Sequence, residues 1–287
     1  MKPSQIAAST TSLAGYNLQD ATETIRRLGY KSVGLLAQDN SRNALGSLAG
    51  FAWHCLEANG MNAVRDAVGP FEGITIHAPY EDLPLVSCSP EVRSLSQIII
   101  QKSTESAPYL HGSVVTFHLE PPRFFDAESV WDAMLAAGRE VARYAHIFRI
   151  KVGVESSPGL APDTFVRLIR ELDAPSLGAT LDVGATARAA LAGQPAGPEA
   201  IALANDVIVR SIRELGQRLY HVHLHDLRPD DWTDHHELGT GVLDLGRIIR
   251  TLDDAGYTGL CEVELEEDNR EEALWNSRLV LEQLVTD

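Results

Sequence analysis

The chain has 287 residues, with 24 Lys and Arg against 40 Asp and Glu, and a formal net charge of −16. Such an acidic chain repels the phosphates of nucleic acids and anionic membranes, so we expect neither as a partner. Hydrophobic residues make up 44 %, enough for a large core, yet no run approaches the ~20 apolar residues of a membrane span. The three cysteines form no CxxC pair, which excludes a disulfide framework and a cysteine zinc site. Because the amino terminus also lacks an apolar signal segment, we expect a cytoplasmic protein.

Short β-rich runs alternate with helical patterns along the chain. The candidate strands are Ile6–Leu13, Ser32–Ala37, Gly73–Ala78, Ser113–Leu119, Ile150–Ser156, Leu177–Val183, Leu219–His225 and Leu260–Leu265. The candidate helices are Leu18–Leu28, Ser129–Phe148, Pro162–Leu172, Pro198–Leu215, Gly246–Ala255 and Glu271–Val285. One strand occurs about every 36 residues, the size of a βα unit.

Eight such units without a change in composition predict an α/β fold, a single (β/α)8 barrel domain over residues 1–287. The alternative is an open doubly wound sheet. No GxGxxG turn follows the first strand, however, so the phosphate turn of a Rossmann fold is missing and we expect no nucleotide cofactor.

In a closed parallel barrel, the carboxyl ends of all strands meet at one mouth, where the site is built. Six consecutive strands carry ionisable residues at their carboxyl ends. These residues are His77, His118, Glu155, Asp182, His223 with His225, and Glu264. Singly, a strand-end His is often structural and a strand-end Asp often caps a helix. Together, these groups would be unfavourable without a compensating charge, and one divalent ion (Mn²⁺, Co²⁺, Zn²⁺ or Mg²⁺) would supply it.

The loop after the seventh strand adds two candidates, Asp234 and His236. Residues two apart in an extended segment point the same way, so we expect both to reach the mouth. The alternative is a solvated acidic loop. Arg228, which opens this loop, could contact substrate or form a surface ion pair.

Lysine is scarce, with only four in the chain, and none lies at the carboxyl end of a strand. A Schiff-base mechanism on this barrel needs a lysine there, so that mechanism is excluded.

Seven motifs give the chain a specific resemblance: HAPY (77–80), VVTFH (114–118), VGVES (152–156), LDVG (181–184), HVHLHD (221–226), HHELGTG (235–241) and CEVE (261–264). Together they resemble the xylose isomerase-like TIM barrels. That superfamily contains sugar isomerases and epimerases, inosose and dehydroshikimate dehydratases, and zinc AP endonucleases. The resemblance implies one divalent metal ion held by Glu155, Asp182, His223 and Glu264.

The resemblance further implies that Glu155 and Glu264 exchange a proton with the substrate carbon. The remaining polar groups of the mouth are expected to contact substrate: His77, His118, His225, Asp234, His236 and Arg228. One position departs from the family pattern, because Ala185 stands where a histidine is common. This departure puts a three-zinc endonuclease site and the usual pose of a sugar in question.

These observations favour a metal-dependent isomerase or epimerase of an uncharged sugar or polyol, because the loops beyond the seventh and eighth strands are acidic and unsuited to phosphate. A dehydratase would use the same residues. A zinc phosphodiesterase and a non-catalytic ligand-binding barrel are the alternatives from other classes. A homo-oligomer is compatible with the sequence.

Overall fold

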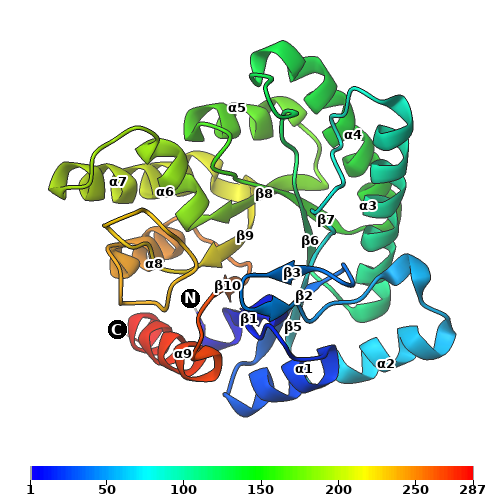
Figure 1. Cartoon of the computed structure of the whole chain (residues 1–287), viewed down its shortest axis with the longest axis horizontal. Coiled ribbons are helices and arrows are strands. Elements are labelled where there is room, and N and C mark those ends of the chain that lie inside the picture. Colours follow the sequence, from blue (N-terminus) through cyan, green and yellow to red (C-terminus); the bar gives the residue numbers. More distant parts are fainter. Residues whose placement is uncertain (1, 287) are drawn as a thin grey trace.

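The structure is a computed structural model that describes residues 2–286, and it forms a closed barrel of parallel strands inside a ring of helices (Figure 1). Around the barrel the strand order is β1-β10-β9-β8-β7-β6-β5-β2, and every neighbouring pair is parallel. The strands are β1 Ile6–Ser9, β2 Ser32–Leu36, β5 Gly73–His77, β6 Val114–Phe117, β7 Lys151–Glu155, β8 Leu177–Asp182, β9 Leu219–Leu224 and β10 Cys261–Val263. The predicted (β/α)8 barrel is confirmed.

The helices lie outside the barrel and bury their apolar faces against it (Figure 1). They are α1 Leu18–Arg27, α2 Ala58–Val68, α3 Pro90–Leu110, α4 Trp131–Phe148, α5 Pro162–Leu172, α6 Val183–Leu191, α7 Pro198–Leu215, α8 Leu245–Asp254 and α9 Arg270–Thr286. From the sequence we predict no range for α2, α3 or α6, although we expect Lys102 in a helix, and it lies in α3. In α3 much of the buried face is small or hydroxylic, including Ser96, Ser103, Thr104 and Ala107, so the apolar period that marks a helix is weak.

The first strand is shorter than expected, because β1 ends at Ser9 and a 3-10 turn follows over Thr10–Ser12. The Ser9 side chain accepts a hydrogen bond from the Thr11 backbone N–H at 3.4 Å, which caps this turn. The Thr11 hydroxyl lies beside the end of the neighbouring strand β10 and donates to Glu264 Oε1 at 2.9 Å.

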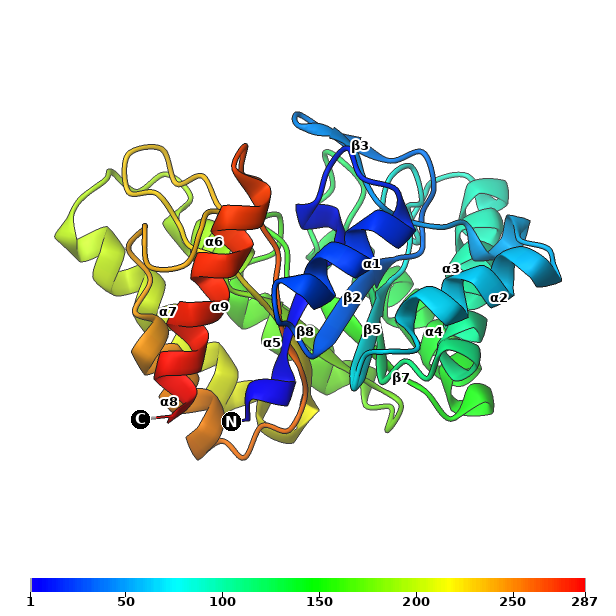
Figure 2. The same ribbon diagram turned by 90° about the horizontal axis from the view of Figure 1, so that it is seen from below.

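A small antiparallel pair, β3 Arg42–Asn43 and β4 Gly46–Ser47, projects from the loop after β2. Figure 2 shows this hairpin at the opposite end of the barrel from both termini. It stands beside the mouth, because Asn43 and Leu48 line the cavity there. Within residues 2–286, no helix is both long and apolar enough to cross a bilayer.

Candidate active site

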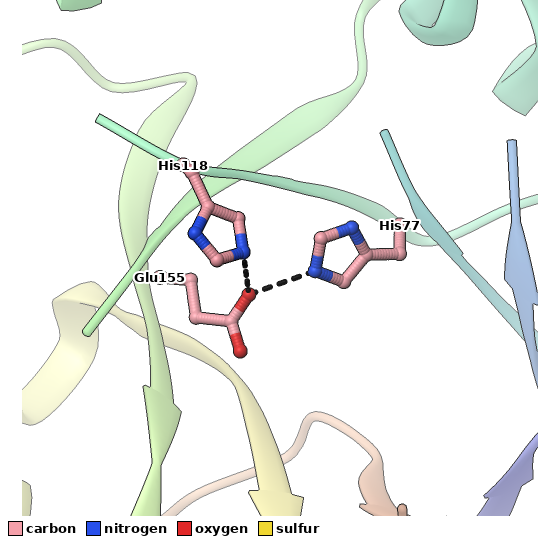
Figure 3. A group of neighbouring side chains, drawn as sticks. All are labelled: His77, His118 and Glu155. Carbon is pink, nitrogen blue, oxygen red and sulfur yellow. Dashed lines mark hydrogen bonds and ion pairs between the residues drawn. The ribbon is translucent and has the colours of Figure 1, made fainter. Parts of the chain in front are cut away.

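Glu155, at the carboxyl end of β7, is the centre of the mouth (Figure 3). His77 Nε2 and His118 Nε2 lie 2.8 and 2.9 Å from its Oε2. His77 Nδ1 donates to the Ala78 carbonyl at 2.7 Å, so a proton or a cation must lie between its other nitrogen and the carboxylate. Burial alone would raise the pKa of Glu155, but the positive charges of the three facing histidines outweigh it and hold that pKa well below its usual range.

The third of these histidines, His223 on β9, joins Glu155 to two further carboxylates. Its Nδ1 lies 2.8 Å from Glu155 Oε1, 3.1 Å from Glu264 Oε2 and 3.9 Å from Asp182 Oδ2. One donor atom from each of these four residues lies within 4.8 Å of the other three. We call Glu155, Asp182, His223 and Glu264 the ligand set. Three carboxylates around one imidazole nitrogen are a donor set suited to a divalent ion.

Next to the ligand set, a polar corner of the cavity is formed by Arg188, Asp234 and His235, which we call the outer corner. Arg188 Nη1 lies 2.9 Å from Asp234 Oδ2, and His235 Nδ1 lies 3.2 Å from Asp234 Oδ1. The His235 ring stacks on that of His225 at 4.1 Å between centroids. Although burial opposes the charged form of His235, the Asp234 hydrogen bond and neighbouring carboxylates raise its pKa to about 10. Two cations thus share one carboxylate.

His225 lies deeper, fully buried between the outer corner and the ligand set. Its Nε2 accepts a hydrogen bond from the Gly184 backbone N–H at 3.2 Å and lies 3.3 Å from Asp182 Oδ1. A Cβ on Gly184 would stand 2.2 Å from that Nε2, so glycine is needed for this packing. His225, which the sequence predicted to contact substrate, therefore packs against Asp182 inside the protein and does not line the cavity.

These groups open into a cavity of about 270 Å³ at the mouth. Its lining is rich in polar side chains from all eight barrel strands and the loops that follow them: Thr11, Asn43, His77, Tyr80, His118, Glu120, Glu155, Ser156, Ser157, Asp182, Arg188, Asp234, His235, Glu264 and Glu266. Ala185 also lines it, so the missing histidine leaves open space beside the outer corner. Chemically, the cavity offers many hydrogen-bonding partners to a hydroxylated molecule.

Of the predicted site residues, the structure brings His77, His118, Glu155, Asp182, Asp234 and Glu264 to the lining of one cavity, and the buried His223 adjoins the three carboxylates of the ligand set. His236 is a correction. The chain is not extended there, because His235 adopts a left-handed backbone with φ of 62°, and the simple alternation of side chains fails. His236 turns away from the cavity, and its Nδ1 pairs with Glu267 at 2.9 Å. His235, which sequence reasoning missed, takes the place at the mouth.

Arg228 is also placed differently from the prediction. Residues 228–233 form a tight turn, with backbone hydrogen bonds from Arg228 N to the Thr233 carbonyl (2.9 Å) and from Trp232 N to the Arg228 carbonyl (3.1 Å). The Arg228 side chain is exposed and is not part of the cavity lining. The arginine at the mouth is Arg188, one helical turn after Ala185 on α6. Because residues three apart lie on the same face of a helix, the spacing from Ala185 could have indicated from the sequence that Arg188 is near the mouth.

Asp226 organises the loop that carries the outer corner. It is fully buried, and its carboxylate accepts hydrogen bonds from the backbone N–H groups of Leu227, Gly239 and Leu243 at 2.9, 2.9 and 3.1 Å. An amide has one acceptor oxygen, so Asp226→Asn leaves a buried N–H facing a donor. We expect it to lower the free energy of unfolding by about 2–4 kcal/mol in urea titrations. Asp230→Asn, an exposed change in the same loop, should change it by less than about 0.5 kcal/mol; equal effects would contradict this role.

The sequence profile of the xylose isomerase-like TIM barrel family matches residues 15–283. The chain belongs to this family. Among curated proteins, an uncharacterized protein of Methanocaldococcus jannaschii is 26 % identical over 223 residues, covering 74 % of this chain and 70 % of that protein.

Solved structures with the same fold include several sugar epimerases. A D-tagatose 3-epimerase-like protein has a TM-score of 0.76 and 22 % identity, covering 98 % of this chain and 97 % of its own. A D-psicose 3-epimerase with D-tagatose from Clostridium cellulolyticum H10 has a TM-score of 0.74 and 14 % identity, covering 98 % and 99 %. A D-allulose 3-epimerase from Methylomonas sp. has a TM-score of 0.73 and 14 % identity, covering 97 % of both chains.

Proposed function

We propose that the protein is a divalent-metal-dependent isomerase or epimerase of an uncharged sugar, keto-sugar or polyol. The observation that carries this proposal is the ligand set, in which Glu155 and Glu264 approach the same His223 nitrogen from different strands. The family membership and the epimerase names of structures with this fold support it.

The ligand set fits a divalent ion because its donors are three carboxylates and one imidazole nitrogen, all turned toward a common point. Such an ion would supply a Lewis acid that polarises a carbonyl and its neighbouring hydroxyl. Ser156 and Thr11 brace the ligand set: the Ser156 hydroxyl accepts from the Asp182 backbone N–H at 3.0 Å, and Thr11 donates to Glu264. The donor atoms are therefore held in place by neighbouring groups.

The two glutamates provide the proton chemistry. One carboxylate removes the proton from the carbon beside the polarised carbonyl, and the other returns a proton from the opposite side, which inverts that carbon. Returning the proton to the neighbouring carbon gives isomerisation instead, and loss of a β-hydroxyl gives dehydration. Because Glu155 and Glu264 lie on strands three places apart in the barrel, a substrate between them meets a carboxylate from two directions.

Substrate class follows from the outer corner and the lining. The cavity is lined by six carboxylates, from Glu120, Glu155, Asp182, Asp234, Glu264 and Glu266, but by one arginine, Arg188, which pairs with Asp234. Such a lining repels a phosphate and offers hydrogen-bond acceptors to the hydroxyl groups of a polyol.

Arg188→Gln should therefore raise KM for the substrate about tenfold, the loss of roughly one hydrogen bond, with a smaller effect on kcat. Arg228→Gln is the matched control, since that side chain is outside the cavity, and its steady-state constants should equal those of the wild type. Equal KM values for the two variants would contradict a role for Arg188 in substrate recognition.

The proposed function is tested by proton–deuterium exchange in D₂O, followed by NMR. The panel contains D-tagatose, D-allulose, D-fructose and L-ribulose, with inososes and dehydroshikimate to detect dehydration, and the protein is loaded in turn with Mn²⁺, Co²⁺, Mg²⁺ and Zn²⁺. Exchange at the carbon beside the carbonyl of a ketose supports the proposal. Elimination confined to inososes or dehydroshikimate, exchange only with the phosphate esters of these ketoses tested as a second panel, or no exchange with any substrate and ion would overturn it.

One observation favours a second candidate, a zinc phosphodiesterase. His77, His118 and Glu155 form another group whose donor atoms lie within 4.8 Å of one another, and it shares Glu155 with the ligand set (Figure 3). Two ions bridged by a carboxylate can clamp a phosphate diester. Two bound zinc ions per chain with cleavage of a diester would favour this function, whereas one ion with sugar exchange supports the epimerase.

A further inference from the structure

The barrel interior is polar directly beneath the mouth. Six mouth residues each have a partner two positions earlier on the same strand and therefore on the same face, one layer deeper. These partners are Thr75, Thr116, Gly153, Thr180, His221 and Glu262, which we call the inner layer. Such positions in parallel barrels are usually filled by bulky aliphatic side chains. Here the layer contains a carboxylate and an imidazole.

Glu262 extends from β10 across the barrel to β5 in this layer. Its Oε2 accepts a hydrogen bond from the Thr75 hydroxyl at 2.6 Å and lies 2.9 Å from His221 Nε2. Glycine at position 34 leaves room for the Glu262 side chain, since a Cβ on Gly34 would stand 1.7 Å from Glu262 Oε1. Burying a carboxylate in the centre of a barrel is unfavourable unless it is paired, and here Thr75 and His221 are its partners.

His221 links this carboxylate to the ligand set. Its Nδ1 donates to the Leu260 carbonyl at 2.9 Å, while its Nε2 shares a proton with Glu262. Both ring nitrogens are thus engaged and the ring is fixed. The His221 and His223 rings meet edge to face, with centroids 4.9 Å apart and an angle of 85° between their planes. One donor atom from each of His221, His223 and Glu262 lies within 4.8 Å of the other two.

We infer that Glu262, through His221, is a positioning residue for the ion-binding histidine His223. The His221 ring, fixed between the Leu260 carbonyl and Glu262, holds the His223 ring with Nδ1 toward the ligand set. Thr116 and Thr180 form the other pair in the layer. Their hydroxyl groups are hydrogen-bonded to each other at 2.8 Å, and this hydrogen bond involves neither Glu262 nor His221. The inner layer therefore contains the proposed positioning pair, Glu262 and His221, and also a threonine pair that can serve as a control.

This inference rests on the proposed function, and Mn²⁺ affinity measured by calorimetry on the full chain tests it. Glu262→Gln keeps the shape of the side chain and removes its charge, and we expect Mn²⁺ binding about 10- to 100-fold weaker with an unchanged far-UV circular dichroism spectrum. Thr116→Val should bind Mn²⁺ as the wild type does. A merely structural role would lower thermal stability without changing Mn²⁺ affinity in the folded protein.

If Glu262→Gln fails to fold, the matched pair Thr75→Val and Thr116→Val decides the question. Both remove a buried hydroxyl from the inner layer, but only the Thr75 hydroxyl reaches Glu262. Weaker Mn²⁺ binding by Thr75→Val alone supports the inference, and equal affinities overturn it. A wild-type chain that takes up neither Mn²⁺ nor Co²⁺ nor Zn²⁺ would overturn the inference and the proposed function together, whereas wild-type affinity in folded Glu262→Gln overturns the inference alone.

Discussion

Replacing Glu264 or Glu155 by glutamine is expected to lower turnover of the sugar substrate about 10³-fold or more. A positioned proton donor or acceptor contributes 10²–10⁴-fold by itself. Each glutamate also belongs to the ligand set, so the amide weakens ion binding in addition. The measurement is kcat/KM at saturating Mn²⁺, with the deuterium exchange rate of the substrate measured in parallel.

The two variants should differ in a second measurement. Glu155 faces three histidines, whereas Glu264 contacts His223 and the Thr11 hydroxyl. Glu155→Gln leaves three imidazoles with one partner fewer, so it should lower the melting temperature more than Glu264→Gln does. Glu267→Gln, whose carboxylate pairs with His236 away from the cavity, is the control and should keep full turnover. Wild-type turnover in either ligand-set variant would show that the proton chemistry is assigned to the wrong groups.

The barrel was predictable because its signals are local and repeated. Alternating strand and helix patterns indicate the βα units, and the rule that strand ends share one mouth brings His77, His118, Glu155, Asp182, His223 and Glu264 together. The structure confirms that proximity. The roles of these residues in ion binding and catalysis remain predictions, as does the single-domain boundary at residues 1–287.

The errors lie in loops, where side-chain direction depends on single backbone angles. Because His235 has a left-handed backbone, His235 and not His236 lines the cavity, and no periodic pattern in the sequence encodes that. Arg188 was not among the predicted site residues because a helical arginine usually forms a surface ion pair. Its proximity to the cavity follows from α6 starting directly at the end of β8. Glu262 lies two residues before Glu264, but its partners come from β5 and β9, contacts that only the closed barrel shows.

Removal of the divalent ion should abolish turnover and lower the melting temperature, and the size of both effects should depend on pH. Burial opposes the charged form of His223, but Glu155 and Glu264 outweigh it and raise its pKa well above 6.5 in the metal-free protein. The imidazole therefore carries a proton near neutral pH. An ion in the ligand set needs that nitrogen unprotonated, so binding must release the proton.

The direction of the pH dependence follows from this exchange. Below the raised pKa of His223, each unit of pH increase should raise the apparent Mn²⁺ affinity about tenfold, since one proton is displaced. In the metal-free protein the charged His223 stabilises the fold below its unfolded pKa, and that stabilisation is lost as pH rises through the folded pKa. The gain in melting temperature on adding Mn²⁺ should therefore be larger at pH 8 than at pH 6.

Calorimetry in buffers of different ionisation enthalpy counts the released protons, and thermal melts with and without Mn²⁺ give the second measure. An ion at 1,000 times its Kd should add about 4 kcal/mol to the free energy of unfolding. His236→Gln, a histidine change away from the cavity, should keep both the proton count and the slope. Mn²⁺ affinity that is constant or falls with rising pH would mean that His223 does not bind the ion, and the ligand set would then have to be reassigned to the group around His77 and His118.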